Sequence, residues 1–319
     1  MTLLVRQQER PRFSARQAAQ GLPQLTTTVP REYVHRAAHA EVFLTGCRRL
    51  DGTRFEVTGQ WPRAHTFFTD ENQTRHDPML AAETVRQVGL LLAHSEFGVP
   101  LGHQFLLHDM EYSVSLANLG IGTEPSELLL EAVCSDVKWR GNRLAQFGMT
   151  ITVERDGRHA AMGRGHFTCV APAAYRRLRA GQGDGRDAAP APRPAPLAPW
   201  RVGRCRAADV VLSATDRPDR WLLAPDRGHP ILFEHAGDHV PGMVLIEAAR
   251  QAACGLLALP GFVPVEVAAE FHQYAEFGSP CWIEAVQLPS PQTGVLSVQV
   301  TGRQDGGEVF GARLNGVVA

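Results

Sequence analysis

The feature that most constrains the fold is a segment that occurs twice. Residues 65–87, HTFFTDENQTRHDPMLAAETVRQ, align without a gap with residues 229–251, HPILFEHAGDHVPGMVLIEAARQ, at a constant offset of 164 residues. The identical pairs include His65/His229, Met79/Met243, Glu83/Glu247, Arg86/Arg250 and Gln87/Gln251. A repeat kept only for core packing would preserve apolar residues and let polar ones change. The pattern therefore favours a shared role for the polar side chains.

The second half of each copy is predicted to be a helix. Pro241 suits a first helical turn, and residues 243–253 contain neither Gly nor Pro. Glu247, Arg250 and Gln251 are spaced i, i+3 and i+4 and so share one face of the helix, and the first copy repeats this spacing. Two interpretations are open: a solvated ion pair on an exposed face, and a buried pair kept for chemistry.

The segments that flank the repeat are also similar in the two halves. A strand-like segment precedes each copy, AEVFLTG at 40–46 and ADVVLSA at 208–214. Asp156-Gly157 predicts a hairpin turn between two later strands. The strand candidates that follow the copies are 103–114, 126–140, 145–157 and 159–171, and then 265–277, 281–288, 294–303 and 308–318. Each half is therefore a strand, a long helix and an antiparallel meander, which is the order of a hot-dog fold.

The predicted class is α+β, with two tandem hot-dog domains packed as a pseudo-dimer, each a curled antiparallel sheet around a central helix. Residues 181–199, rich in Gly, Ala and Pro, are predicted to be an extended linker. They separate a first domain at 27–180 from a second at 200–319, and residues 1–26 are predicted to be disordered. Because the helix of a hot-dog fold is buried, this architecture favours the buried interpretation of the two helix carboxylates.

Composition excludes several classes of protein. The 319 residues carry a net charge of −1, so no broad basic surface for nucleic acid is expected. The six cysteines are scattered without the spacing of a metal site, so we expect no metal and a reducing compartment. The N-terminus lacks the apolar stretch of a signal peptide, and no segment is long enough to cross a membrane. We therefore expect a cytoplasmic protein that binds neither nucleic acid nor membrane.

One segment of the second copy resembles an active site. FEHAGDHVPGMVLIEAARQAA resembles the active-site segment of the β-hydroxyacyl-carrier-protein dehydratases, in which a His precedes a Pro-Gly turn and a helix bearing a Glu. His235, Pro241-Gly242 and Glu247 follow that order. The distance from His to Glu is, however, two residues shorter than in the dehydratases, which argues against plain dehydration.

The closer similarity is to the A-factor biosynthesis (AfsA-type) hot-dog family, whose members carry two such domains. HPILFEHAGDHVPGMVLIEAARQ is the most typical stretch of that family, and VPREYVHRAAHAEVFLTG and WPRAHTFF also resemble it. The resemblance covers residues 27–319. It implies a γ-butyrolactone-type signal synthase, an acyltransferase without a bound cofactor. Such an enzyme moves a β-ketoacyl group from acyl carrier protein to a hydroxyl of dihydroxyacetone phosphate.

Acyl transfer to an alcohol needs a base, donors for the developing oxyanion and a site for the phosphate of the acceptor. A carboxylate buried among apolar residues has a raised pKa, which makes Glu83 and Glu247 candidates for the base. Gly242, at a helix N-terminus, would let a thioester carbonyl approach backbone N–H groups. Arg86 and Arg250 could clamp the phosphate through two hydrogen bonds each.

In the dehydratases the His of one domain meets the Glu of the other, so two composite sites are expected here. Glu71 occupies the position of His235, and Pro78 occupies that of Gly242, so the loop of the first domain lacks both the His and the Gly. We infer that only the site that joins this second-domain loop to Glu83 is complete. In this hypothesis Glu83 is the base, His235 orients the substrate or carries a proton, and Gly242 lies at the oxyanion. Arg250, alone or together with Arg86, binds the phosphate, and Glu247 holds an arginine in place.

Several further residues have both a structural and a functional interpretation. His65 and His229 could be structural hydrogen-bonding groups or part of the site, with Gln87 and Gln251 in support. Asp77 is interpreted as a helix cap, and Cys254, Tyr112 and Tyr274 as core residues. Capping and function are both open for Asp238, and His239 is equally open to a supporting role in the site.

Three functions remain open on the sequence. The first is the acyltransferase. The second is an acyl-thioester dehydratase or thioesterase of the same fold, since fold alone does not decide the reaction. The third is an acyl-ligand sensor without catalysis. The repeated ExxRQ and the family resemblance favour the first, in a chain that is either a monomer, as an internal pseudo-dimer, or a homodimer.

Overall fold

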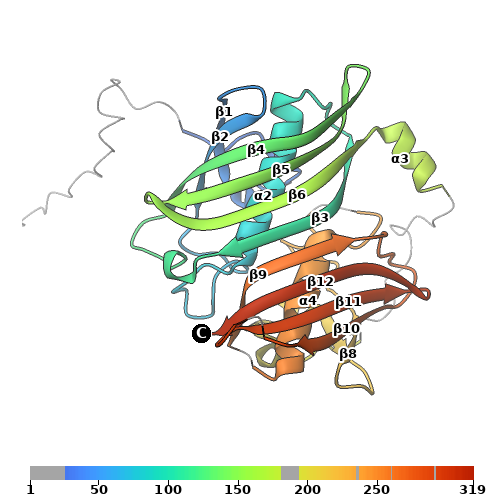
Figure 1. Cartoon of the computed structure of the whole chain (residues 1–319). Helices are drawn as coiled ribbons and strands as arrows, with labels where there is room; N and C mark the ends of the chain where they lie inside the picture. The colour runs from blue at the N-terminus through green and yellow to red at the C-terminus, as the bar shows by residue number, and fades with distance from the viewer. Residues whose placement is uncertain (1–25, 181–193, 235–236, 260, 291) are drawn as a thin grey trace, which may run out of the picture.

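The computed structural model describes residues 26–180, 194–234, 237–259, 261–290 and 292–319. The two halves contain the same elements in the same order (Figure 1). The first half comprises η1 (Arg31–Val34), η2 (His39–Glu41), β1 (Leu44–Arg49), β2 (Arg54–Trp61), α2 (Met79–Leu91), η3 (Leu92–Glu96), β3 (Gln104–Val114), η4 (Leu116–Asn118), β4 (Ser126–Arg140), β5 (Arg143–Arg155), β6 (Arg158–Val170) and α3 (Pro172–Leu178).

The second half repeats this order, and its described residues contain no counterparts of η3, η4 and α3. It comprises η5 (Pro199–Val202), η6 (Ala207–Asp209), β7 (Leu212–Ala214), β8 (Arg220–Leu223), α4 (Gly242–Leu257), β9 (Phe262–Phe271), β10 (Cys281–Leu288), β11 (Leu296–Gln304) and β12 (Gly307–Val318). The predicted tandem hot-dog architecture is confirmed. Most of the predicted linker, residues 181–193, lies outside the described residues, as does the segment 1–25 that was predicted to be disordered.

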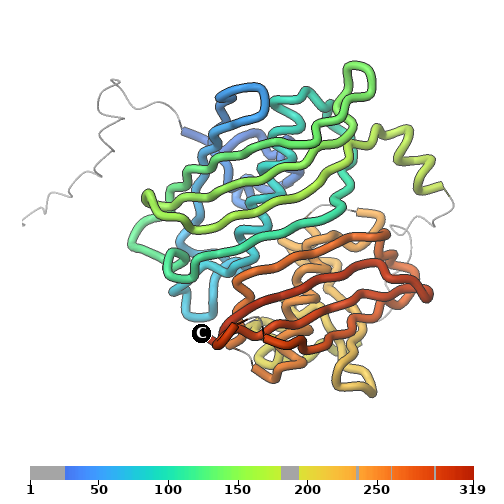
Figure 2. Tube along the Cα trace, in the orientation of Figure 1, coloured from blue at the N-terminus to red at the C-terminus, as the bar shows by residue number. Residues whose placement is uncertain are grey.

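All strands belong to one antiparallel sheet in the order β1-β2-β4-β5-β6-β3-β9-β12-β11-β10-β8-β7. This order is the same from either end when each strand is replaced by its counterpart, so the halves are related by a pseudo-twofold axis. The axis passes between β3 and β9, whose register is centred on Glu111 opposite Ala268. Figures 1 and 2 show the sheet in front of the two helices, with α2 behind the first half and α4 behind the second. The two domains thus share one continuous sheet.

Each central helix is buried because the sheet curls around it. Arg86 is the one residue of α2 that is not buried, and α4 is buried from Val244 to Cys254. The first part of β4, Ser126 to Cys134, alternates between buried and exposed residues, as a strand does when one face packs on a helix and the other faces solvent. α2 approaches β6 so closely that a Cβ on Gly89 would lie 2.6 Å from the ring of Phe167.

Some elements differ from the prediction. The Asp156-Gly157 hairpin is confirmed, with positive φ values of 52° and 71°. The strands that precede the repeat begin at Leu44 and Leu212, later than predicted, because η2 and η6 occupy their expected first residues. Strands β2 and β8 and helix α3 were not predicted at all.

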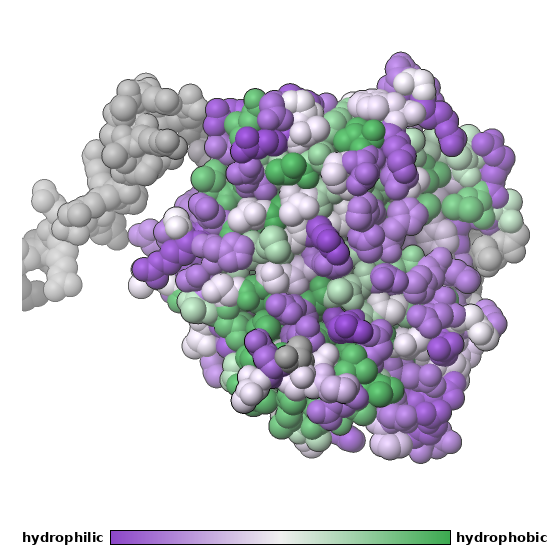
Figure 3. Space-filling model, in the orientation of Figure 1, coloured by the Kyte–Doolittle hydropathy of each residue, from purple (hydrophilic) through white to green (hydrophobic). Residues whose placement is uncertain are grey.

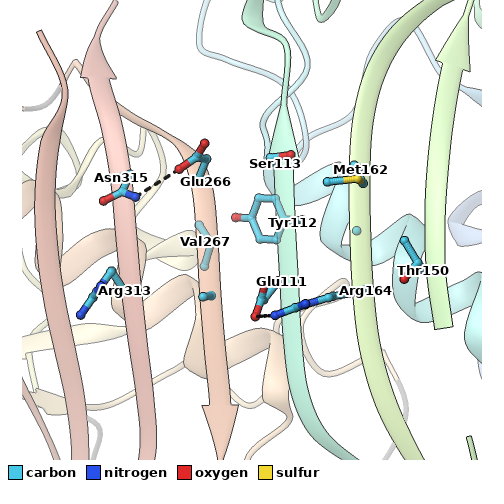
Figure 4. A pocket seen from close by; sticks show the side chains of 12 residues that line it. Glu111, Tyr112, Ser113, Thr150, Met162, Arg164, Glu266, Val267, Arg313 and Asn315 are labelled. Atoms are coloured by element: carbon cyan, nitrogen blue, oxygen red, sulfur yellow. Dashed lines mark hydrogen bonds and ion pairs between the residues drawn. The ribbon is translucent and has the colours of Figure 1, made fainter. Parts of the chain in front are cut away.

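The outer face of the sheet is open to solvent. Figure 3 shows apolar side chains on it that are separated by hydrophilic ones. A depression of about 300 Å³ crosses the β3–β9 junction, with Glu111, Arg164 and Arg313 among its lining residues (Figure 4). Of the predicted site residues that the structure describes, none lines it. No helix in the described part of the chain has the length and apolar character that crossing a membrane requires.

Candidate active site

The carboxylate of Glu83 is the centre of a buried charged network. Glu83 is 0% exposed. It accepts hydrogen bonds from Nε of Arg36 at 3.0 Å, from Nε of Arg86 at 2.9 Å and from Nε2 of Gln87 at 2.7 Å. Second guanidinium nitrogens of Arg36 and Arg86 each lie 2.8 Å from the same carboxylate. Two cations therefore share one buried anion.

The second half contains the same network. Glu247 is also 0% exposed. It accepts hydrogen bonds from Nη2 of Arg204 at 2.6 Å, from Nε of Arg250 at 2.9 Å and from Nε2 of Gln251. Arg204 corresponds to Arg36 in position and in bonding. The buried interpretation of the repeated Glu, Arg and Gln is confirmed.

The expectation of a raised pKa for these carboxylates is wrong. Burial would raise the pKa of Glu83, but Arg36 and Arg86 outweigh it and hold the pKa at about 2. Arg204 and Arg250 likewise hold the pKa of Glu247 at about 2 against the effect of burial. Both carboxylates are therefore ionised and weakly basic at neutral pH. The low pKa removes the argument for Glu83 as the general base, which depended on a raised pKa.

The side-chain amides of Gln87 and Gln251 bind each central helix to the backbone segment that precedes the first strand of its domain. Gln87 accepts a hydrogen bond from the N–H of Phe43 at 3.0 Å and donates to the carbonyl of Glu41 at 2.7 Å. Gln251 makes the same pair of bonds with Val211 and Asp209, at 2.9 and 2.8 Å. These contacts support a structural role for both glutamines.

Arg36 and Arg204 also connect the two domains. Nη1 of Arg36 donates to the carbonyl of Ile231 in the second domain at 3.1 Å, and Nη1 of Arg204 donates to the carbonyl of Phe67 in the first at 2.9 Å. Glu234 also lies 3.4 Å from Nη1 of Arg36. The loop that precedes α4 is therefore in contact, through Arg36, with the cluster around Glu83. The hypothesis of a composite site requires such a contact, and its pairing of His235 with Glu83 stays a prediction because His235 lies outside the described residues.

The repeated histidines hold backbone turns. Nδ1 of His65 accepts hydrogen bonds from the N–H groups of Phe67 and Phe68, at 3.1 and 3.0 Å. Nδ1 of His229 accepts equivalent bonds from Ile231 and Leu232, at 3.2 and 3.0 Å. In each case Nε2 faces an acid, Glu41 or Asp209. The geometry favours the structural interpretation of both residues.

The loops before the two helices differ. In the first domain Asp70 accepts hydrogen bonds from the N–H groups of Thr74 and Arg75, so the loop folds around its own acid. Asp77 accepts a bond from the N–H of Met79 at 2.9 Å, as a cap does, and also lies 3.3 Å from Nη1 of Arg204.

In the second domain Asp238 makes side-chain contacts instead. The capping interpretation of Asp238 is wrong, because α4 has Pro241 as its N-cap residue and no side-chain cap. Asp238 accepts hydrogen bonds from the hydroxyl of Tyr175 at 2.8 Å and from Nε of Arg179 at 3.1 Å, and it lies 2.7 Å from Nδ1 of His239. His235 lies outside the described residues, so its predicted role stays a prediction.

Gly242 is the first residue of α4, as expected. A Cβ at this position would lie 3.2 Å from the ring of Phe271, so a side chain here would crowd the start of the helix. Val244 and Leu245 donate their N–H groups to the carbonyl of Pro241. Within the described residues, the N–H groups of Gly242 and Met243 have no backbone acceptor. They could receive a developing oxyanion.

The two candidate phosphate-binding arginines are not equally accessible. The side chain of Arg250 is 6% exposed and bonds to Glu247 and to the carbonyls of Val202 and Gly203. The side chain of Arg86 is 17% exposed. It bonds to Glu83 and the carbonyl of Val34. Arg86 is the better placed of the two to contact a ligand.

Comparison with known proteins fits this geometry. The family model described as the A-factor biosynthesis hotdog domain (AfsA) matches residues 17–171 and 186–315. The chain belongs to the AfsA family. A relative from Streptomyces virginiae is 50% identical over 90% of this chain and 96% of its own. Others from Streptomyces coelicolor and Streptomyces griseus are 42% and 44% identical, over 93% and 89% of this chain and 94% of their own. All three are named 2-oxo-3-(phosphooxy)propyl 3-oxoalkanoate synthase, so these AfsA relatives are enzymes.

A solved structure from Lactobacillus plantarum, titled as a putative oleoyl thioesterase, has a similar fold. It covers 84% of this chain and 98% of its own, with a TM-score of 0.51 and 11% sequence identity. At that identity the likeness concerns the fold alone.

Sequence reasoning missed the arginines Arg36 and Arg204. They lie 47 and 43 residues from the carboxylates that they bind. A signal was present, however. The strand-like segments 40–46 and 208–214 align at an offset of 168 residues, and extending that alignment upstream places Arg36 over Arg204.

Proposed function

We propose that this protein is a 2-oxo-3-(phosphooxy)propyl 3-oxoalkanoate synthase. It transfers a 3-oxoacyl group from the thioester of acyl carrier protein to a hydroxyl of dihydroxyacetone phosphate, the committed step in making a γ-butyrolactone-type signal. The observation that carries the proposal is the match, over about nine tenths of this chain, to relatives that bear this name. The transfer as proposed uses no bound cofactor, since the acyl group arrives on the phosphopantetheine arm of its carrier.

The reaction takes place where the loop before α4 meets the Glu83 cluster. The N–H groups of Gly242 and Met243 stabilise the oxyanion that forms when the acceptor hydroxyl attacks the thioester carbonyl. This is one composite site, because the first-domain loop has Glu71 and Pro78 where the second has His235 and Gly242. His235 remains a candidate for orienting the substrate or carrying a proton.

Glu83 acts here as an anchor. It holds Arg36 against the second-domain loop and holds Arg86 at the edge of the cluster. Arg86 binds the phosphate of the acceptor through Nη1, because its Nε and Nη2 already donate to Glu83 and to the carbonyl of Val34. Glu247, Arg204 and Arg250 form the equivalent anchor in the other half, with a structural role.

The test is mass spectrometry of the products from purified protein and a 3-oxoacyl carrier protein, with and without dihydroxyacetone phosphate. A phosphorylated ester, or a butenolide formed from it, is expected only when both substrates are present. Free 3-oxo acid in both reactions would identify a thioesterase instead. No turnover of the 3-oxoacyl substrate, with dehydration of the 3-hydroxyacyl analogue, would identify a dehydratase.

A further inference from the structure

The proposed transfer needs a group that accepts the proton of the acceptor hydroxyl. Neither helix carboxylate is suited to that role. Glu83 and Glu247 each lie between two guanidinium groups, with pKa values held at about 2 despite burial. An efficient general base has a pKa near the pH at which the enzyme works. The base must therefore be sought elsewhere in the composite site.

A second polar cluster lies beside the start of α4. Asp238 and His239 stand in the loop that leads to Gly242, and the side chain of His239 is 29% exposed. The His239 ring packs on Tyr274, with ring centroids 4.4 Å apart, and Gly242 lies against Phe271, the last residue of β9. The N–H of Val240 donates to the carbonyl of Ala275 at 2.8 Å and fixes the loop there. His239 therefore stands three residues before Gly242, in a loop that is held against the end of β9 and the segment after it.

The hydrogen bonds of this cluster define the state of His239. Burial would raise the pKa of Asp238, but its bonds with Tyr175 and His239 and the charge of Arg179 hold the pKa at about 2, so this carboxylate only accepts. The proton between Asp238 and His239, 2.7 Å apart, therefore sits on Nδ1. Nε2 then carries the lone pair of the neutral ring, and no described residue hydrogen-bonds to it.

Charged and titratable side chains from three segments of the described chain surround His239. They are Asp238, Tyr175, Tyr274, Arg179 and Glu276. Arg179 forms ion pairs with both Asp238 and Glu276. Burial lowers the pKa of His239, and Asp238 opposes that effect only in part. The imidazole is therefore neutral at neutral pH.

We propose that His239, oriented by Asp238, is the general base of the acyl transfer. Nε2 takes the proton of the acceptor hydroxyl as its oxygen forms the new C–O bond with the thioester carbonyl carbon. The tetrahedral intermediate then collapses and the C–S bond breaks. The imidazolium returns the proton to the departing sulfur, which leaves as the thiol of the phosphopantetheine arm. The step is balanced in atoms and charge, and it rests on the proposed function.

The first domain has no such pair. Thr74 and Arg75 occupy the positions of Asp238 and His239, and their backbone N–H groups bond to Asp70. Helix α3, whose Tyr175 bonds to Asp238, has no counterpart in the described residues after β12. The pair is therefore present at only one of the two composite sites.

The test is the pH dependence of the transfer, from about pH 5.5 to 8.5, for the wild type, His239→Asn and Asp238→Asn. The amide of Asn can still donate to Asp238, so His239→Asn keeps the loop in place but removes the base. We expect kcat to fall by about 10²–10⁴-fold, with KM little changed and the acid limb of kcat/KM lost. Asp238→Asn removes the negative charge beside the imidazole and shifts the acid limb to lower pH.

A matched control is His166→Asn. His166 also faces an aspartate, Asp109 at 2.8 Å, but lies on the outer face of the sheet. We expect this variant to keep wild-type kinetics. An unchanged kcat in His239→Asn would overturn the inference, as would a lower kcat with the acid limb retained. If His239→Asn fails to fold, an unshifted acid limb in Asp238→Asn overturns it. If the wild type forms no phosphorylated ester, the proposed function itself fails and the inference falls with it.

Discussion

The two halves of the molecule share a buried network and differ in the loop that precedes the central helix. In both halves a glutamate is held between two arginines and a glutamine, and one arginine reaches the backbone of the other domain. The loop of the first half folds around Asp70, whereas that of the second presents Asp238, His239 and Gly242. The repeated network of glutamate, arginines and glutamine joins the two domains, whereas the loop before α4, which the first half does not repeat, carries groups suited to the proposed acyl transfer.

The largest effect is expected from breaking the shared network. Arg36→Met and Arg204→Met each leave a buried carboxylate with one cation fewer and remove a contact between the domains. We expect each to lower the free energy of unfolding by about 3–5 kcal/mol. Urea denaturation measures this. Arg54→Met is the control, because its ion pair with Glu131 is about half exposed and contributes less than about 1 kcal/mol. A large loss in only one half would contradict the equivalence of the two networks.

The network also predicts how stability depends on pH. The pKa values of Glu83 and Glu247 fall from a usual 4.5 to about 2 on folding, so their contribution is complete above about pH 4.5. It is lost as the pH falls from about 4.5 towards 2. The urea midpoint should therefore decrease over this range, less steeply in Glu83→Gln and in Glu247→Gln. A midpoint that rises on acidification would mean that the carboxylates are protonated in the folded protein.

The substitution Gly242→Ala tests whether the loop before α4 contributes to catalysis. In Gly242→Ala the new Cβ would lie 3.2 Å from Phe271 and displace the oxyanion donors. We expect kcat/KM to fall by less than about 10²-fold, the loss that a full 1 Å misplacement causes, because a few tenths of an ångström relieve this contact. Gly278→Ala, where a Cβ would meet nothing within 4 Å, should leave the rate unchanged. Equal rates in the two variants would argue against an oxyanion site at Gly242.

The smallest effect is expected from replacing the two candidate phosphate-binding arginines, Arg86 and Arg250, which differ in exposure. Lys in Arg86→Lys cannot hold Glu83 and present a further donor in a fixed direction as the guanidinium does, so the substitution should raise KM for dihydroxyacetone phosphate by about tenfold. Arg250→Lys should lower stability and leave that KM unchanged, because Arg250 is more deeply buried. Initial rates at varied acceptor concentration measure both. The reverse result would assign the phosphate to the other composite site.

Much of the fold could be predicted from sequence because the repeat is local. The 3.6-residue pattern of α2 and α4 and the alternation of the long strands lie within single segments. Strands β2 and β8 and helix α3 are short or poorly patterned, and their pairing depends on the rest of the sheet. The candidate site was predicted less completely. The residues of the Glu83 cluster on α2 are visible at helical spacing, but Arg36, which decides the charge state of Glu83, comes from a separate segment.

The pair formed by Asp238 and His239 shows the same limit. The sequence places both in the loop, but it does not show that Tyr175 and Arg179, from the end of the first domain, bind Asp238. The two contacts join segments 63 and 59 residues apart, and they make Asp238, for which capping and function were both open, a partner of His239. Their geometry comes from tertiary structure alone.

The most direct test is the number of active sites in each chain. Native mass spectrometry can count how many molecules of a non-reactive donor analogue bind to one chain in the presence of dihydroxyacetone phosphate; in this analogue of the 3-oxoacyl-pantetheine, CH₂ replaces the thioester sulfur and the carbonyl is kept. Because the two loops differ while the two networks are equivalent, we predict one bound donor analogue per chain. Its binding should be weakened by Gly242→Ala and unaffected by substitution at the equivalent Pro78. Two bound analogues per chain would contradict a single composite site.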